Sequence, residues 1–337
     1  MSKINIKKST TAATITASIL LGLMLLSPTT MLPQINAQQS TIPSLPSHVV
    51  KTLDSIHQQL KNHSGWISMM KWDSSGTTID YLGPADKNPY LVKSGPNTSL
   101  SAPSVIPLSA SIPINLEDPP LADRSGSTSE YKEVQDFTVQ KSSVSTVNFY
   151  QILNALNSDK SHWMQNVLVY DNYGAYGGGA RWVQLLDVFN KATCSDSPGI
   201  SASTSLNISA GDAIEQYTYA QSGSPGQYDF GETDITKNNG YVTSTTISGD
   251  TGSSINLDKT NCGVNGYDSG PEVEEHAQNG VGVYHFNQIA FTEGYYDTSS
   301  SSKTTSVTGW DTTDGCGATV SNQNNPAKAT FTYSGAC

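Results

Sequence analysis

The sequence predicts an all-β fold, an antiparallel β-sandwich or jelly roll preceded by an N-terminal extension. Only 14% of the 337 residues are charged and 36% are hydrophobic. Such a chain can bury a sheet core, but it has few charged residues for the solvent-facing sides of helices. After residue 129, short segments rich in β-branched and aromatic residues alternate with polar turns. No helical pattern interrupts these segments, which argues against a parallel α/β fold.

The N-terminus has the pattern of a secretory signal peptide. Three lysines precede an apolar run over residues 15–26, and Ala37 offers a small residue for cleavage. The run is shorter than the about 20 residues that span a bilayer, and no later stretch approaches that length. We therefore expect residues 1–37 to be removed and the mature chain to be secreted or extracellular at the cell surface, with no transmembrane segment.

The charge of the mature chain bears on its partners. Cleavage removes three lysines from a chain of net charge −11, which leaves −14. A protein this acidic repels the phosphate backbone and anionic membrane surfaces. We expect no nucleic-acid partner, and we expect a monomer whose substrate is an extracellular protein or glycan.

Four cysteines lie in the exported part of the chain, which predicts two disulfides. Three connectivities are possible, and we favour Cys194–Cys262 with Cys316–Cys337 because each pair closes a loop within one β segment. Their spacing contains no Cys-x-x-Cys pair, so a zinc cluster is not expected. We expect neither a metal nor another cofactor.

Residues 38–128 form the predicted N-terminal extension, which is either a pro-segment or a packed arm, and residues 129–337 form the predicted β-sandwich domain. Between Ser47 and Gly65, apolar residues recur at helical spacing, which predicts a short amphipathic helix: Val49, Leu53, Ile56 and Leu60. Residues 95–121 contain six prolines, which favours an extended covering segment.

Six strands stand out in the second part of the chain: residues 147–154, 162–170, 181–189, 213–220, 281–291 and 329–333. In the second of these strands, Trp163 and Gln165 share one face, and Asn166 lies on the other. In the third strand, Trp182 and Gln184 share a face. Neither strand has a polar side, so both faces are covered or one lines a groove. The candidates for substrate binding in such a groove are Trp163, Trp182, Gln184 and Tyr217.

An acidic cluster offers the other half of a possible catalytic site. The common serine and metallopeptidase signatures, Gly-x-Ser-x-Gly and His-Glu-x-x-His, are absent from the sequence. Glu272 and Glu274 would share one strand face, with Glu275 opposite. A glutamine amide can donate to a developing oxyanion while a glutamate activates water, which hydrolyses a peptide without serine, cysteine or metal. The alternative without function is a solvated acidic edge.

The order of the segments resembles the eqolisin family of secreted glutamic peptidases, whose fold is a concanavalin A-like jelly roll. The resemblance covers roughly residues 147–292. It implies that Gln165 takes the place of the catalytic glutamine and that Glu272 matches the first glutamate of the family's strand. His276 then falls at the catalytic glutamate, and a two-residue slip places Glu274 there. The matching stretches are Trp163-Met-Gln165, Trp182-Val-Gln-Leu, Ile208-Ser-Ala-Gly211-Asp212-Ala-Ile214, Pro271-Glu272-Val-Glu274 and Ile289-Ala-Phe291-Thr292.

A looser similarity extends to thermopsin-like secreted acid peptidases. The resemblance therefore implies an acid-active endopeptidase in which Glu272 or Glu274 activates water and Gln165 holds the oxyanion. Two other functions remain open at this stage. One is a non-catalytic concanavalin-like module that binds carbohydrate or peptide on the aromatic rings of Trp163, Trp182, Tyr217 and Tyr219. The other is a cell-surface structural protein.

Overall fold

The structure is a computed structural model whose described residues belong to one compact unit, residues 42–337. The described residues are 45–92, 121–124, 129–176, 179–190, 192, 195–196, 200–202, 206–257, 259–262, 265–277, 288–297, 303–304, 306, 310–313 and 318–333.

The described elements are one α-helix, one 3-10 helix and many strands. The helices are α2 (Ser47–Asn62) and η1 (Ala85–Lys87). The strands up to residue 202 are β1 (Trp66–Asp73), β2 (Gly76–Pro84), β3 (Leu91–Val92), β4 (Leu121–Arg124), β5 (Ser129–Thr138), β6 (Val147–Asn157), β7 (His162–Asp171), β8 (Arg181–Asn190), β9 (Ser195–Asp196) and β10 (Ile200–Ala202). The later strands are β11 (Ala213–Ala220), β12 (Gln227–Asp234), β13 (Asn239–Thr246), β14 (Ile255–Asn256), β15 (Lys259–Cys262), β16 (Asn265–Asp268), β17 (Gly270–Ala277), β18 (Gln288–Asp297), β19 (Trp310–Thr313), β20 (Ala318–Asn324) and β21 (Ala327–Tyr333).

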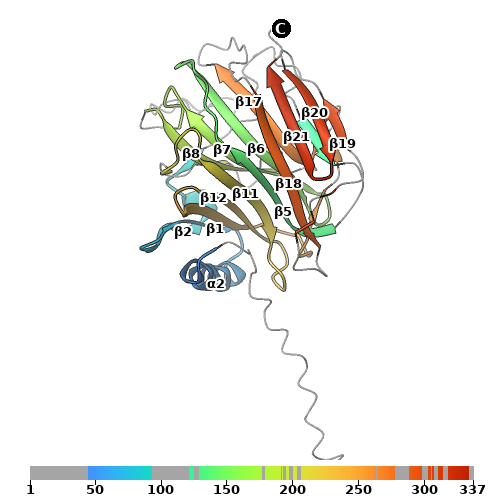
Figure 1. Cartoon of the computed structure of the whole chain (residues 1–337). Helices are drawn as coiled ribbons and strands as arrows, with labels where there is room; N and C mark the ends of the chain where they lie inside the picture. The colour runs from blue at the N-terminus through green and yellow to red at the C-terminus, as the bar shows by residue number, and fades with distance from the viewer. Residues whose placement is uncertain are drawn as a thin grey trace, which may run out of the picture. The chain divides into compact units, whose positions relative to one another are not determined.

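The strands pair antiparallel in two layers. The first layer runs β3-β10-β8-β7-β6-β17-β4-β19, and the second runs β2-β1-β13-β12-β11-β5-β18-β21-β20. The short strand β14 pairs with both β5 and β6 and so joins the layers. Figure 1 shows β6, β7 and β8 side by side, with α2 beside β1 and β2. The predicted antiparallel sandwich is confirmed.

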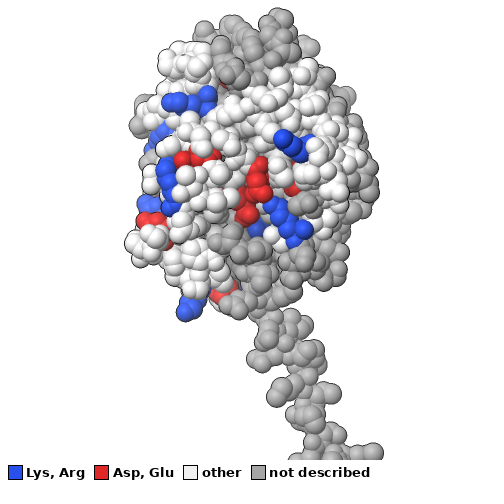
Figure 2. Space-filling view, viewed as in Figure 1, with Lys and Arg blue, Asp and Glu red and all other residues white. Residues whose placement is uncertain are grey.

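The space between the layers is the main core. At one end, Phe149, Leu168 and Trp182 of the first layer pack against Ile214 and Phe291 of the second. At the other end, a second apolar cluster joins the same two layers: Met164, Leu186, Val188, Ala220, Tyr228 and Phe230. On the molecular face shown in Figure 2, charged side chains are few and lie in small groups among uncharged residues. On the described part of this face, the low charged fraction of the sequence thus appears as a mostly uncharged surface.

The predicted amphipathic helix is confirmed as α2, which begins at Ser47 after Pro46. Its predicted apolar residues Val49, Leu53, Ile56 and Leu60 are buried against the outer face of the second layer, where they pack with Met70, Trp72 and Val242. His57 Nε2 lies 2.9 Å from Asp229 Oδ1 and ties the helix to β12.

The N-terminal strands belong to the same sheet as the later ones. Strand β1 pairs with β13 over six residues, from Ile67 opposite Thr245 to Trp72 opposite Gly240. The domain boundaries at residues 37 and 128 stay predictions. The signal peptide and the proline-rich segment up to residue 120 lie outside the described residues. No helix in the described part of the chain is long and apolar enough to cross a membrane.

The disulfides also stay predictions. Cys194, Cys316 and Cys337 lie outside the described residues, and Cys262 is placed only by its backbone in β15. Of the strands predicted from the sequence, β6, β7, β8, β11 and β21 agree within three residues at either end. The strand predicted at 281–291 is described from Gln288 onward, as β18.

Candidate functional site

A polar row crosses the outer face of the first layer. Asn154 of β6 is paired with Gln165 of β7, which is paired with Asp187 of β8. Directly paired residues in an antiparallel sheet point to the same side, so the three side chains share one face. On the other side of Asn154, β17 contributes Gly270, which has no side chain and a φ of +116°. The row therefore ends at a position of β17 that has no side chain.

Glu272 lies next to this position on the same strand. It lies two residues beyond Gly270 on β17 and therefore points to the same face. Asn154 Nδ2 donates a hydrogen bond of 2.8 Å to Glu272 Oε2. The side chains of Gln165 and Glu272 are each only 4% exposed. Asn154 thus connects the carboxyl and the amide that the sequence singled out, which are more than a hundred residues apart in the chain.

The register of β17 against β6 places the two candidate glutamates at different distances from Gln165. Glu272 is paired with Ile152 and Glu274 with Tyr150, so Glu274 lies one pleat farther from Gln165. With strands about 4.8 Å apart and about 3.4 Å per residue, the Cα of Gln165 is roughly 12 Å from that of Glu272 and roughly 17 Å from that of Glu274. Two side chains and a water molecule span the shorter distance, which favours Glu272.

Glu274 lies instead beside a pair of tyrosines. Tyr150 Oη and Tyr176 Oη are 3.0 Å apart, and burial is the main cause that raises the pKa of both. The charge of Glu274 is a smaller cause for Tyr176. The loop that carries Tyr176 is fixed by Asp171, whose carboxylate accepts hydrogen bonds from the backbone N–H groups of Ala175 and Tyr176. This loop covers the Glu274 end of the face.

Between the polar row and the tyrosine pair, the outer face of the first layer is apolar. This apolar part consists of Ile152, Val167, Val169, Val183 and Leu185, all buried. Trp163, half-buried, lies on the same face of β7, two residues before Gln165. The face therefore has hydrogen-bonding groups at one end and buried apolar side chains beside them.

The other predicted substrate-binding residues lie elsewhere. Trp182 packs in the core between the layers, and Gln184 Nε2 donates to Asn166 Oδ1 at 2.9 Å in the same interior. Tyr217 is fully buried on the outer face of the second layer, in the cluster that packs under α2. A ligand over Gln165 would not contact these three residues. The period of two assigns residues to faces correctly, but it does not tell which face is the interior.

The aromatic residues that were predicted to bind a ligand together are also separated. Trp163, Trp182 and the pair Tyr217 and Tyr219 lie on three different surfaces, so they do not form one stacking surface. Glu275 is buried on the opposite face of β17 from Glu272. Among the described residues, no group of three or more His, Cys, Asp or Glu side chains is placed to hold a metal ion.

Sequence reasoning missed Asn154 and Asp187. Both are polar residues in strands that are buried along most of their length, and both are themselves buried. An amide or a carboxylate inside an otherwise apolar strand is expensive unless it is hydrogen-bonded, and this was the available signal. It could not identify the partners, because pairing depends on the register between strands.

Comparisons with known proteins find only low similarity. No protein-family profile and no curated protein matches the sequence. Among solved structures, the chain is similar to scytalido-glutamic peptidase with a transition-state analogue inhibitor: identity is 13%, the TM-score is 0.41, and the match covers 64% of this chain and 97% of the other.

Two further solved structures show the range of the similarity. The first is SCP-B, a member of the eqolisin family of peptidases, in complex with a tripeptide: identity is 11%, the TM-score is 0.37, and coverage is 64% of this chain and 96% of the other. The second is the enzymatically active domain of tailspike protein 2 of bacteriophage CBA120, with 12% identity, a TM-score of 0.24 and 62% and 33% coverage. The looser resemblance to thermopsin-like peptidases stays a sequence-based prediction.

Proposed function

We propose that the chain is a secreted, acid-active endopeptidase of the glutamic type. The observation that carries the proposal is the shared face of Gln165, Asn154 and Glu272, with the hydrogen bond of 2.8 Å from Asn154 to Glu272. The signal-peptide pattern supports secretion, and the sequence resemblance to eqolisins supports the reaction type.

The proposed reaction needs only these side chains and water. The Glu272 carboxylate takes a proton from a water molecule, whose oxygen attacks the scissile carbonyl carbon. The side-chain N–H of Gln165 donates to the oxyanion that forms. As the C–N bond breaks, Glu272 returns the proton to the leaving amine, and the carboxylate is regenerated. Asn154 holds the Glu272 carboxyl in place through the hydrogen bond to Oε2.

The decisive experiment is digestion of an unfolded protein substrate by the purified mature chain between pH 2 and pH 7. Gln165→Ala should lower the rate about 100- to 1000-fold, the usual cost of removing one oxyanion donor. Gln288→Ala is the matched control, because Gln288 is an exposed glutamine on β18. Equal rates for the wild-type chain and Gln165→Ala would refute the mechanism.

A second comparison separates the two glutamates. Glu272→Gln keeps the shape of the side chain and removes the base, so it should lower the rate at least 100-fold. Glu274→Gln should lower it much less, because the register places Glu274 one pleat farther from Gln165. The reverse order of effects would assign the base to Glu274 and would show that the pairing of β17 differs in the active protein.

A further inference from the structure

A pocket of about 290 Å³ lies away from the Gln165 face. Its walls come from the β1–β2 hairpin, the ends of β12 and β13, and the segment 206–208. The lining residues that matter here are Glu232, Asp234, Asp73, Trp72, Leu206 and Ile208. None of Gln165, Asn154 and Glu272 lines the pocket, so it is separate from the proposed peptidase site.

Glu232 contributes a buried carboxyl group to the pocket, and only one of the two oxygens of this group accepts a hydrogen bond from a described residue. Glu232 is 1% exposed, and Gln216 Nε2 donates to its Oε1 at 2.7 Å. Its other oxygen, Oε2, is buried and accepts no hydrogen bond from any residue that the structure describes. Burial raises the pKa of Glu232 well above the usual value, and the hydrogen bond from Gln216 opposes this only in part. A ligand that donates to Oε2 would remove an energetic penalty.

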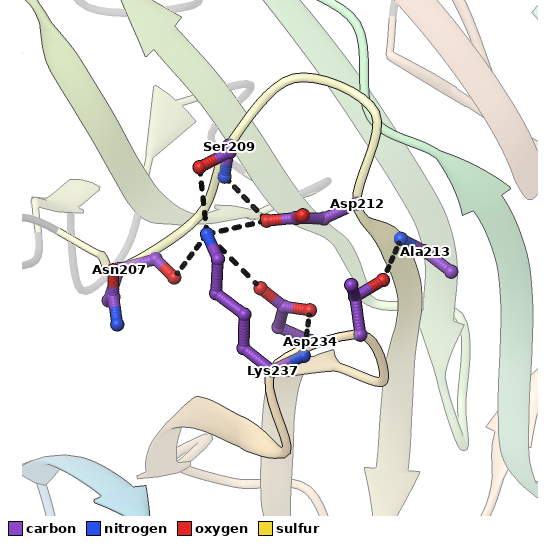
Figure 3. A network of polar contacts seen from close by, with 7 residues as sticks. Asn207, Ser209, Asp212, Ala213, Asp234 and Lys237 are labelled. Atoms are coloured by element: carbon purple, nitrogen blue, oxygen red, sulfur yellow. Dashed lines mark hydrogen bonds and ion pairs between the residues drawn. The ribbon is translucent and has the colours of Figure 1, made fainter.

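The nearby lysines are already engaged. Lys71, which also lines the pocket, lies 3.1 Å from Asp80 Oδ1. Lys237 Nζ lies 2.7 Å from Asp212 Oδ2 and 3.8 Å from Asp234 Oδ2, and Figure 3 shows it at the centre of this network. Lys237 also donates to the Asn207 backbone carbonyl and to Ser209 Oγ, which fixes the segment after Leu206 against the turn between β12 and β13.

The lining therefore has more acidic than basic side chains. Glu232, Asp234 and Asp73 contribute three carboxyl groups, against the single lysine Lys71. The remaining wall includes two aliphatic residues, Leu206 and Ile208. A pocket lined by aliphatic residues and carboxyl groups suits a ligand that has an aliphatic chain and a cationic end.

We propose that this pocket binds an alkyl ammonium or alkyl guanidinium group, such as the side chain of a lysine or arginine residue in a peptide, with its cationic end at Glu232. The cation would donate to Oε2, and its methylene groups would pack against Leu206 and Ile208. This inference stands independently of the proposed peptidase activity.

The test is calorimetric titration of the full mature chain with agmatine, a butyl chain with a guanidinium group at one end and an ammonium group at the other. N-butylurea, which lacks both charges, and a methyl glucoside are the comparison probes. Agmatine should bind at least 10-fold more tightly than either probe, because the charge-assisted hydrogen bond is lost with them. Absence of agmatine binding, or tighter binding of the glucoside, would overturn the proposal.

Two variants locate the binding. Glu232→Gln keeps an oxygen that can accept from Gln216, and it should weaken agmatine binding at least 10-fold. Ile208→Trp fills the pocket from the opposite wall and should abolish binding, which keeps the test valid if the Glu232 variant does not fold. Wild-type affinity in either folded variant would show that agmatine binds elsewhere and would overturn the assignment.

Discussion

Two neighbouring amides in β7 have opposite surroundings. Asn166 points into the space between the layers, where Nδ2 donates to the backbone carbonyls of Tyr217 at 2.9 Å and Gly231 at 3.0 Å. Its Oδ1 accepts from Gln184 Nε2 at 2.9 Å. Gln165 points to the outer face, and its amide makes no hydrogen bond to another residue in the described ranges. The same chemical group is thus an interior cross-link at one position and lies on the outer face at the next.

The interior amides form a network that joins the two layers. Gln216 of β11 donates to the Asn166 backbone carbonyl at 2.8 Å and to Glu232 Oε1 at 2.7 Å. Thr243 of β13 donates to Gln184 Oε1 at 3.0 Å. Each bond is satisfied only in one alignment of the layers, so the network fixes how the two sheets stack. The outer row around Gln165 has no such role.

The largest expected effect comes from comparing the two amides directly. Asn166→Leu removes three hydrogen bonds and leaves the buried carbonyls of Tyr217 and Gly231 without these donors. It should lower the free energy of unfolding by about 4 kcal/mol, since unsatisfied buried polar groups cost about 1–3 kcal/mol each. Gln165→Leu should change it by less than about 1 kcal/mol. Urea denaturation of both variants at neutral pH measures the difference.

Equal destabilisation by the two substitutions would contradict the comparison, because it would mean that Gln165 is also a structural cross-link. The matched control is Gln288→Leu, which makes the same change at an exposed position of β18. It should leave the unfolding free energy within about 0.5 kcal/mol of the wild type.

Lys132 provides a second buried polar group for comparison. Its ammonium group is buried, and the nearby Glu215 carboxylate offsets the cost of this burial only in part. Lys132 is fully buried on the outer face of the second layer, with Nζ 3.7 Å from Glu215 Oε1 and 4.7 Å from the centre of the Tyr217 ring. Burial lowers its pKa from 10.5 to about 8, although Glu215 opposes the shift. Lys132→Met should therefore raise the free energy of unfolding at pH 7 by up to about 3 kcal/mol.

The pH dependence separates this explanation from a simple packing effect. Below pH 8 the lysine is protonated in both the folded and the unfolded chain, so the full penalty is present. Between pH 8 and pH 10.5 the folded chain releases the proton and the unfolded chain keeps it, so stability rises by up to about 1.4 kcal/mol per pH unit. Denaturation at pH 7 and pH 9.5 should show this rise in the wild type and not in Lys132→Met. A parallel change in both proteins would assign the effect to other groups.

The sequence predicts several apolar strands and misses the polar strands β12 and β13. It also misses β1, an apolar strand within the predicted N-terminal extension. Strands β6, β7 and β8 are found because nearly every residue in them is buried. Strands β12 and β13 carry the segments QYDFGETD and NGYVTSTT, whose polar residues resemble a loop. They are buried because the interior network and α2 supply partners such as Gln216 for Glu232 and His57 for Asp229. These partners come from distant parts of the chain, so a local pattern does not reveal them.

The candidate site, like the fold, could be predicted from the sequence only in part. Residue periodicity places Gln165 on one face of its strand and places Glu272 and Glu274 together on another strand. It does not show that Asn154 lies between them, because this depends on β6 pairing with both β7 and β17. For the same reason, it assigns Gln184 to a groove when that side chain is an interior cross-link. Strand pairing decides which of two similar amides is available.

The smallest expected effect tests the link between the amide and the carboxyl. Asn154→Ala removes the Nδ2 donor that orients Glu272 but leaves Gln165 and Glu272 intact. The rate of peptide hydrolysis should fall about 10-fold, as expected for one hydrogen bond of about 1.4 kcal/mol to a charged group. Because the change affects the base and not the oxyanion donor, it should also move the pH–rate profile, whereas Gln165→Ala should lower the rate without moving it. A fall in rate with the profile unchanged would show that Asn154 supports the fold of the face and does not position the glutamate.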